Sequence, residues 1–211
     1  MHQMALFGAG EGVLADDERG RIEYVPRFVP PPLAPEWFAE LRGKVGWEAG
    51  RRWMYDREVD VPRLTAHFDL APRPAGDAPL PVAVLDAAAR VLARTGVAFN
   101  SVGLNLYRDG RDSVAAHNDH LHELAPGFPI ALVSLGATRR MAIRAKEPPR
   151  RVLDVDLEGG SLLLMSYETQ LHYTHGLPKT ADRVGERISL AFRVRPAVAD
   201  PAARARGGYY R

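Results

Sequence analysis

Apolar positions recur at helical spacing in the first part of the chain. The stretch "EYVPRFVPPPLAPEWFAELRGKVGW" predicts a short strand, a proline-rich turn and then a helix. Pro35 suits the first turn of this helix. An apolar stripe along it is formed by Trp37, Phe38 and Leu41. The pattern therefore predicts one amphipathic helix that follows a short strand.

A second and longer helix is predicted by the stretch "APLPVAVLDAAARVLARTG". One face of it carries the apolar side chains of Val82, Leu85, Ala89 and Leu92. Gly96 suits the residue that follows its last turn. The stretch "DLAPRPAGDAPLP" before this helix is rich in proline and predicts a loop.

Beyond Gly96 the pattern changes to short runs of period two, separated by turn signals. The runs are "AFNSVGLNLY", "SVAAHND", "PIALVSLG", "RRMAIRA", "RVLDVDL", "SLLLMS" and "RISLAFRV". Roughly seven or eight short strands in about 100 residues are typical of a sandwich, a barrel or a jelly roll. There is no internal repeat, and the final stretch "ADPAARARGGYYR" is interpreted as a tail.

The composition is that of a globular protein of one domain, with or without an N-terminal attachment. The 211 residues are 46% hydrophobic and 26% charged, which are ordinary values. The absence of cysteine excludes disulfides, thiolate metal sites, iron–sulfur clusters and a cysteine nucleophile. No apolar run approaches the length of a membrane helix, and the stretch "MHQMALFGAGEGVLADDERG" lacks the features of a signal peptide. We therefore expect a cytoplasmic protein with no membrane partner, and a monomer.

Positive charge is unevenly distributed, although the net charge is only +2. The stretch "TRRMAIRAKEPPRR" contains one acid, Glu147, against Arg139, Arg140, Arg144, Lys146, Arg150 and Arg151. Such a run can contact the phosphates of a nucleic acid. On composition alone such a run is more typical of a solvated hairpin whose arginines serve solubility.

The stretch "SVAAHNDHLHEL" is the main candidate for metal chemistry. On a strand, His117 and Asp119 point to the same side because they are two positions apart. An imidazole and a carboxylate that face one point are the start of a facial triad of two histidines and one carboxylate. His172 or His175 in "QLHYTHGLPK" can supply the third ligand. The alternative is a solvated strand edge that happens to be rich in histidine.

Two further strands carry polar residues on one face. Arg187 and Arg193 share a face of "RISLAFR" with Ser189, and inside a small barrel two arginines require anions. A dicarboxylate suits them because guanidinium binds carboxylate in a bidentate manner. Asn105 and Tyr107 share a face of "LNLY" and can donate neutral hydrogen bonds. The alternative places both faces outside, in water, with the intervening apolar residues as the core.

The order of these motifs resembles the AlkB family of Fe(II)- and 2-oxoglutarate-dependent dioxygenases, in particular the branch with the DNA-repair enzymes of animals. The resemblance covers residues 47–195 and is closest in "FNSVGLNLYRDGRDSVAAHND", "ELAPGFPIALVSLGATR", "GGSLLLMS" and "HGLPK". It implies an α+β, mainly β fold: a double-stranded β-helix of the jelly-roll type with N-terminal helices packed on it. The segments then expected are an N-terminal extension (1–46), a nucleotide-recognition segment with its supporting helix (47–98), the catalytic core (99–196) and a tail (197–211).

The resemblance assigns roles residue by residue. The implied iron ligands are His117, Asp119 and His175, whereas His172 is not expected to coordinate. The implied 2-oxoglutarate contacts are Asn105, Tyr107, Arg187, Arg193 and Ser189. The implied contacts with the target nucleotide are Tyr55, Arg63, Phe68 and His120. Phosphate contacts are expected from Arg139 and Arg140.

The implied activity is the oxidative demethylation of N-alkylated bases in DNA or RNA, with Fe(II), 2-oxoglutarate and O2, as a direct-reversal repair. The same chemistry on a protein, a lipid or a small molecule is the alternative, and a non-catalytic jelly-roll binding module is a third. The sequence departs from the family where close relatives have acids after the iron-binding aspartate, since His120 and Leu121 stand there. Ala191 also replaces a hydroxyl residue. The preferred lesion is therefore left open by the sequence.

Overall fold

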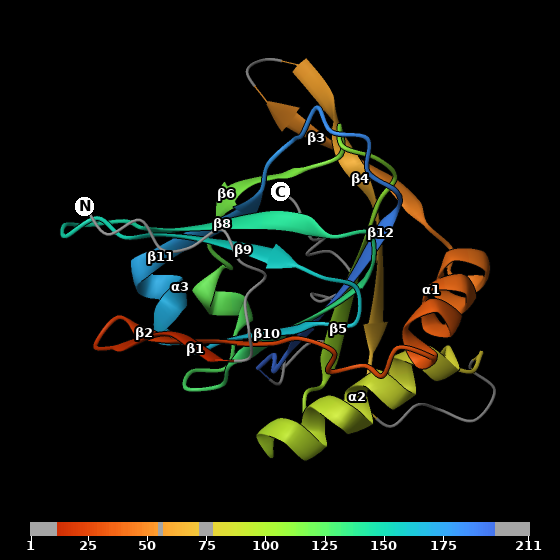
Figure 1. Cartoon of the computed structure of the whole chain (residues 1–211), viewed down its shortest axis with the longest axis horizontal. Helices are drawn as coiled ribbons and strands as arrows, with labels where there is room; N and C mark the ends of the chain where they lie inside the picture. The colour runs from red at the N-terminus through yellow and green to blue at the C-terminus, as the bar shows by residue number, and fades with distance from the viewer. Residues whose placement is uncertain (1–11, 55–56, 72–77, 197–211) are drawn as a thin grey trace.

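The computed structural model describes residues 12–54, 57–71 and 78–196. Within these ranges the side chains of residues 52–54 and 57–58 are not described. Twelve strands are found in this part of the chain, and they form two antiparallel sheets (Figure 1). Before residue 96 the strands are β1 (Gly12–Asp17), β2 (Gly20–Val25), β3 (Glu48–Met54) and β4 (Arg57–Asp69). After it come β5 (Ser101–Tyr107), β6 (Val114–His117), β7 (Ile130–Gly136), β8 (Arg139–Ala145), β9 (Val152–Leu157), β10 (Leu162–Met165), β11 (Tyr173–Leu177) and β12 (Arg187–Arg193).

The larger sheet has the strand order β1-β2-β10-β7-β12-β5-β4-β3, and the smaller has the order β6-β11-β8-β9. Strands far apart in sequence are therefore neighbours in both sheets, as in a jelly roll. The N-terminal extension expected from the sequence contributes β1 and β2 to the larger sheet, because β2 pairs with β10. The expected nucleotide-recognition segment contributes β3 and β4 to the other end of that sheet, because β4 pairs with β5.

Helices α1 (Leu33–Lys44) and α2 (Val82–Thr95) cover the outer face of the larger sheet (Figure 1). A hydrophobic core joins them to that sheet, with Trp37 and Leu41 of α1 among its members. A second core lies on the inner face, toward the smaller sheet. The predicted jelly roll with helices packed on it is confirmed.

The central strand β12 is buried on both of its faces. Ile188 and Phe192 pack into the core beneath the helices, whereas Ala191 belongs to the inner core between the sheets. Arg187 and Ser189 share the inner face with Ala191 and are 1% and 2% exposed. The interpretation that places these polar residues outside in water is therefore wrong, because the helices supply a second apolar layer.

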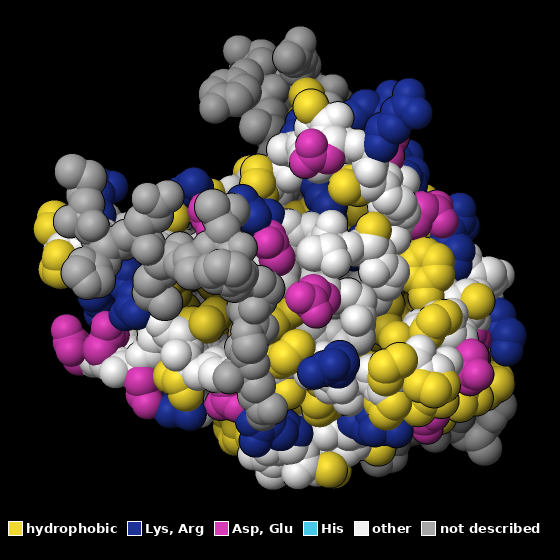
Figure 2. All heavy atoms as spheres, viewed as in Figure 1, with side chains coloured by type: hydrophobic (Ala, Val, Ile, Leu, Met, Phe, Trp, Pro, Cys, Tyr) yellow, Lys and Arg dark blue, Asp and Glu magenta, His cyan; other side chains and the backbone are white. Residues whose placement is uncertain are grey.

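The face of α2 that packs on the sheet differs from the predicted one. The largest side chains of the predicted stripe are 45–59% exposed: Val82, Leu85 and Leu92. The face that packs inward consists of smaller residues: Ala83, Val84, Ala87 and Val91. Small side chains let the helix lie close to the sheet. Because the larger side chains of α2 face outward, hydrophobic side chains gather on the surface near the helices (Figure 2). The end of the helix is as predicted, since Gly96 adopts a left-handed conformation with φ of 70°.

The pattern of hydrophobic and polar positions did not predict strand β1, the hairpin of β3 and β4, strand β11 or the short helix α3 (Glu168–His172). The stretch that forms α3 and β11 is polar and has no clear period, so its sequence pattern indicates neither element. Strand β11 is defined by its pairing with β6 and β8, which lie on either side of it. A short 3₁₀ helix, Leu121–Glu123, follows the end of β6. No helix among the described residues is long and apolar enough to cross a membrane.

Candidate active site

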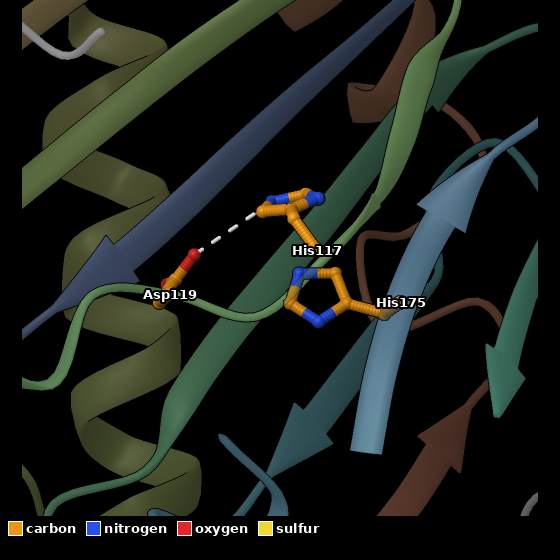
Figure 3. A group of neighbouring side chains, drawn as sticks. All are labelled: His117, Asp119 and His175. Carbon is orange, nitrogen blue, oxygen red and sulfur yellow. Dashed lines mark ion pairs between the residues drawn. The ribbon is translucent and has the colours of Figure 1, made fainter. Parts of the chain in front are cut away.

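Two neighbouring strands of the smaller sheet bring together two histidines and a carboxylate (Figure 3). His117 is the last residue of β6 and lies opposite His175 of β11 in the sheet register. The two imidazole rings are 4.5 Å apart between centroids, and Nε2 of His117 lies 3.9 Å from Oδ1 of Asp119. One potential ligand atom from each residue lies within 4.8 Å of the others, the spacing expected around a single metal ion.

Each ligand is oriented by a different contact. Nδ1 of His117 donates to the carbonyl of Ala115 at 2.8 Å, which leaves Nε2 free to bind a metal. Asp119 lies beyond the end of β6, so strand alternation does not place it, contrary to the sequence argument. Its backbone N–H donates to Oε1 of Gln170 at 2.9 Å, and its Oδ2 accepts from Nε of Arg193 at 2.6 Å.

The electrostatics of the group favour the metal-binding protonation states. Burial lowers the pKa of His175 to about 4, with a further decrease from the nearby His117. Burial also lowers the pKa of His117. Burial alone would raise the pKa of Asp119, but the charge and hydrogen bond of Arg193 hold it well below its usual range. At neutral pH the group therefore presents two neutral imidazoles and one carboxylate, the donor set that suits a divalent iron site.

A buried arginine faces the same cavity. The guanidinium of Arg187 lies 5.2 Å from the ring centroid of Tyr107 and donates to Oγ of Ser134 at 2.8 Å. Its Nε is buried and has no hydrogen-bond partner among the described residues, and no carboxylate there forms an ion pair with it. A buried cation with an unused donor is costly unless an anion completes it. This orphaned donor fits the carboxylate of 2-oxoglutarate.

A single cavity of about 1390 Å³ joins these features. Its walls include the metal group and all five residues expected to bind 2-oxoglutarate: Asn105, Tyr107, Arg187, Arg193 and Ser189. Nδ2 of Asn105 lies 3.5 Å from Oγ of Ser189, on the adjacent strand. The structure thus brings the predicted residues of β5 and β12 together beside the histidines.

Three of the four residues expected to contact the nucleotide also line this cavity: Arg63, Phe68 and His120. Arg63 is only 4% exposed and donates from Nε to Oδ1 of Asn105 at 2.8 Å and from Nη1 to the carbonyl of Ser113 at 3.2 Å. It therefore ties the recognition segment to the expected 2-oxoglutarate contact on β5. His120 is exposed. Phe68 is half-buried and packs against the core beneath the helices, opposite Val102 of β5, so its side chain lies on the other face of the sheet from Arg63 and the expected nucleotide contact is not supported. Tyr55 lies outside the described residues.

The expected phosphate contact at Arg139 is wrong. This side chain is 3% exposed and donates to the backbone carbonyls of Asp109, Asp112 and Pro178 at 2.8–3.0 Å. It ties the loop at 109–112 to Pro178, which follows β11, so its donors are already used by the protein backbone. Arg140 is exposed and forms a bidentate pair with Asp156 at 2.8 and 2.9 Å. A phosphate contact at Arg140 stays a prediction, and it would have to compete with this pair.

Two polar residues near the site were not identified from the sequence. Gln170 is wholly buried and contacts the backbone of Asp119. Glu123 lines the cavity and lies 3.4 Å from Arg195. Neither residue belongs to a recognisable motif, and each lies in a short helix that the sequence pattern does not indicate. The sequence therefore offered no signal for either one.

A histidine–aspartate–histidine group that could hold a metal ion and a buried arginine share one cavity inside a jelly roll, the arrangement expected of a metal-dependent oxygenase. The comparison with known families agrees, since the description "2OG-Fe(II) oxygenase superfamily" matches residues 21–193. The chain belongs to this superfamily.

Similar proteins include AlkB homologues of animals. The chain is 44% identical over 106 residues to human "DNA oxidative demethylase ALKBH2", a match covering 47% of this chain and 41% of that protein. The bovine protein of the same name is 36% identical over 182 residues, covering 76% and 64%. Rat "Alpha-ketoglutarate-dependent dioxygenase alkB homolog 3" is 33% identical, covering 82% and 63%. The chain therefore spans less than two thirds of the length of these relatives.

A solved structure described as "The structure of OsALKBH1" superposes on this chain with a TM-score of 0.52. The superposition covers 82% of this chain and 97% of that one, at 15% sequence identity. At this identity the likeness supports the fold alone.

Proposed function

We propose that this protein is an Fe(II)- and 2-oxoglutarate-dependent dioxygenase that removes N-methyl groups from bases in DNA or RNA. The observation that carries the proposal is that His117, Asp119 and His175 share one cavity with the buried, unpaired donor of Arg187. The names of the DNA demethylases to which the chain is similar favour a methylated base as the substrate.

The donor set fits iron, and His117, Asp119 and His175 would hold it. The oxidation of an N-methyl group, which no side chain here can carry out, is the chemistry that iron, 2-oxoglutarate and O2 supply when bound. The hydroxymethylated base then breaks down to formaldehyde and the unmodified base.

The protein's own residues bind and orient the reactants. Arg187 would bind one carboxylate of 2-oxoglutarate through its free donor, and Tyr107, which packs against Arg187, borders the same region. Asn105 and Ser189 offer neutral hydrogen bonds from adjacent strands. Arg193 keeps Asp119 ionised and lies where it can also face a carboxylate beside the metal. In this proposal 2-oxoglutarate would lie between the arginines and the histidines.

The size of the cavity supports a large substrate. Its volume of about 1390 Å³ exceeds the roughly 300–1,000 Å³ of ordinary small-molecule sites, so a co-substrate leaves room for a base. A base enters such a site only when its nucleotide is flipped out or single-stranded. Arg63 and His120 lie in the walls of this cavity, where they can contact that base.

A formaldehyde-release assay on a panel of methylated DNA and RNA oligonucleotides tests the proposal. We expect release that requires Fe(II) and 2-oxoglutarate and is abolished in His117→Ala and Asp119→Ala, each checked for folding by circular dichroism. If 2-oxoglutarate turnover occurs and no methylated oligonucleotide supports formaldehyde release, the nucleic-acid substrate is wrong, and a protein, lipid or small-molecule substrate takes its place. Activity retained in either variant would overturn the metal ligands.

A further inference from the structure

Gln170 uses both ends of a wholly buried side-chain amide. It lies in α3 and is 0% exposed. Oε1 accepts the backbone N–H of Asp119 at 2.9 Å, and Nε2 donates to Oγ1 of Thr169 at 3.0 Å. Thr169 is itself buried, and its hydroxyl donates to the carbonyl of Ser166 at 2.6 Å. The orientation of the amide is therefore determined, since its donor and its acceptor have different partners.

Asp119 needs a contact of this kind. The ladder of the smaller sheet ends with His117, two positions earlier, so strand pairing does not fix the backbone of Asp119. Arg193 holds the carboxylate, and Gln170 holds the backbone. With both contacts, the carboxylate has a fixed position as well as a fixed charge.

Gln170 is also close in sequence to the opposite ligand. Helix α3 ends at His172 and leads directly into β11, which carries His175. The amide thus joins the loop of one ligand to the element that carries another. Nζ of Lys146, beyond the end of β8, donates to the backbone carbonyl of Gln170 at 2.9 Å and anchors this segment from the neighbouring strand.

The helix that carries Gln170 is held tightly from outside. A helix of five residues has little stability of its own. A Cβ atom placed on Gly20, which has φ of +116°, would lie 2.7 Å from Oγ of Ser166 and 2.8 and 2.9 Å from atoms of Thr169. The β1–β2 hairpin therefore packs against α3 with no space for a side chain at its turn. The helix that carries Gln170 is therefore supported by close packing against this turn.

We propose that Gln170 is a positioning residue of the metal site, which sets metal affinity by fixing Asp119 relative to His175. The proposal rests on the metal-binding part of the proposed function. Partners that orient metal ligands change metal affinity by about 10–100-fold when they are removed. A glutamine that merely satisfied buried donors would change stability and leave metal affinity unaltered, so the two properties are measured separately.

Three substitutions of Gln170 distinguish the effect of side-chain length from the effect of the acceptor oxygen. Gln170→Met keeps the length and loses the amide. Gln170→Asn keeps the amide and shortens the reach. Gln170→Glu keeps both the length and an acceptor oxygen. The matched control is Ser161→Ala, which removes the hydrogen bond of another wholly buried side chain, from Oγ of Ser161 to the carbonyl of Glu158 at 2.7 Å, at a site that does not line the cavity.

The measurement is an anaerobic titration of the full chain with Co(II), alongside a thermal unfolding scan of the metal-free protein. We expect Co(II) affinity to fall about ten-fold or more in Gln170→Met and Gln170→Asn, and to stay within about three-fold of wild type in Gln170→Glu and Ser161→Ala. If Gln170→Met does not fold, the Asn and Glu variants decide the question. Unchanged affinity in folded Gln170→Met or Gln170→Asn would overturn the proposal, as would an equal loss in Ser161→Ala.

The outcome is distinguishable from a failure of the proposed function. Wild-type protein that binds Co(II) but demethylates no oligonucleotide refutes the substrate and leaves the role of Gln170 standing. Wild-type protein that binds no divalent metal refutes the site itself, and the proposal for Gln170 with it.

Discussion

Arg193 and Asp119 form a hydrogen-bonded ion pair across 74 positions of sequence, with Nε 2.6 Å from Oδ2. Both side chains are mostly buried, at 13% and 11% exposure. The arginine expected to bind 2-oxoglutarate thus also keeps a metal ligand ionised before any metal or co-substrate arrives. Charge balance in the cavity therefore links the two expected binding sites.

Replacing Arg193 by methionine should destabilise the metal-free protein by about 3 kcal/mol at pH 7, because Asp119 is left as a buried carboxylate without its charge partner. The folded pKa of Asp119 lies below its unfolded value, so the pair stabilises the protein above about pH 4 and is lost as the pH falls. Urea unfolding measures the free energy of unfolding at pH 7 and at pH 3, and the difference between these two values should be smaller in Arg193→Met than in wild type. Arg140→Met, which breaks an exposed pair, should cost less than about 1 kcal/mol, and equal losses in both variants would contradict the argument.

The metal-free protein should lose stability as the pH falls from about 6.5 to about 4. Burial lowers the pKa of His175 to about 4 in the folded state, so the unfolded chain takes up the proton first. The shift corresponds to a loss on the order of 3 kcal/mol across that range. Urea unfolding at several pH values measures it, and His175→Asn should flatten the curve. A variant with the wild-type slope would show that His175 is not the titrating group.

Arg187 and Arg139 should respond in opposite directions to the same substitution. Arg187→Met removes a buried cation that has no anion among the described residues, and the metal-free protein should gain about 1 kcal/mol. Arg139→Met removes three bonds to carbonyls and should cost about 3 kcal/mol. Thermal or urea unfolding measures both effects.

Arg187→Met should also raise the 2-oxoglutarate concentration needed for turnover by about 100-fold, since a carboxylate loses its charge partner. The 2-oxoglutarate concentration needed by Arg187→Lys should lie between those of Arg187→Met and wild type, because lysine keeps the charge but lacks the paired donors of a guanidinium. An unchanged co-substrate titration in Arg187→Met would refute its assigned role.

His120→Asp should improve turnover of cationic lesions such as 1-methyladenine and 3-methylcytosine by several-fold. His120 is exposed and lines the cavity next to Asp119, where a carboxylate would attract a positively charged base. The measurement is formaldehyde release from cationic and neutral methylated bases in matched oligonucleotides. The same change on both kinds of base, or a loss on the cationic ones, would refute this view of the position.

The sequence alone determined all but one of the strands beyond Gly96, and its motif order indicated the jelly roll and the residues that face its cavity. Period-two patterning places Asn105, Tyr107, Arg187 and Ser189 on inner faces, because alternation along a strand is local and survives folding unchanged. The separation of His117 and His175 in sequence gave no geometry by itself. The order of the motifs, through the family resemblance, identified His117 and His175 as ligands of one metal. The register of β6 with β11 puts the two residues opposite each other.

Only the tertiary structure decided which contacts hold these residues in place. The exposed apolar face of α2, the burial of Arg139 and the helix that presents Gln170 all depend on neighbours distant in sequence. Asp119 shows the difference most directly. Its position two residues after His117 suggested a metal ligand, but it lies beyond its strand and is fixed by Gln170 and Arg193. Local alternation encodes which way a strand residue points, whereas a loop residue is positioned by hydrogen bonds from elements that only the folded chain brings near.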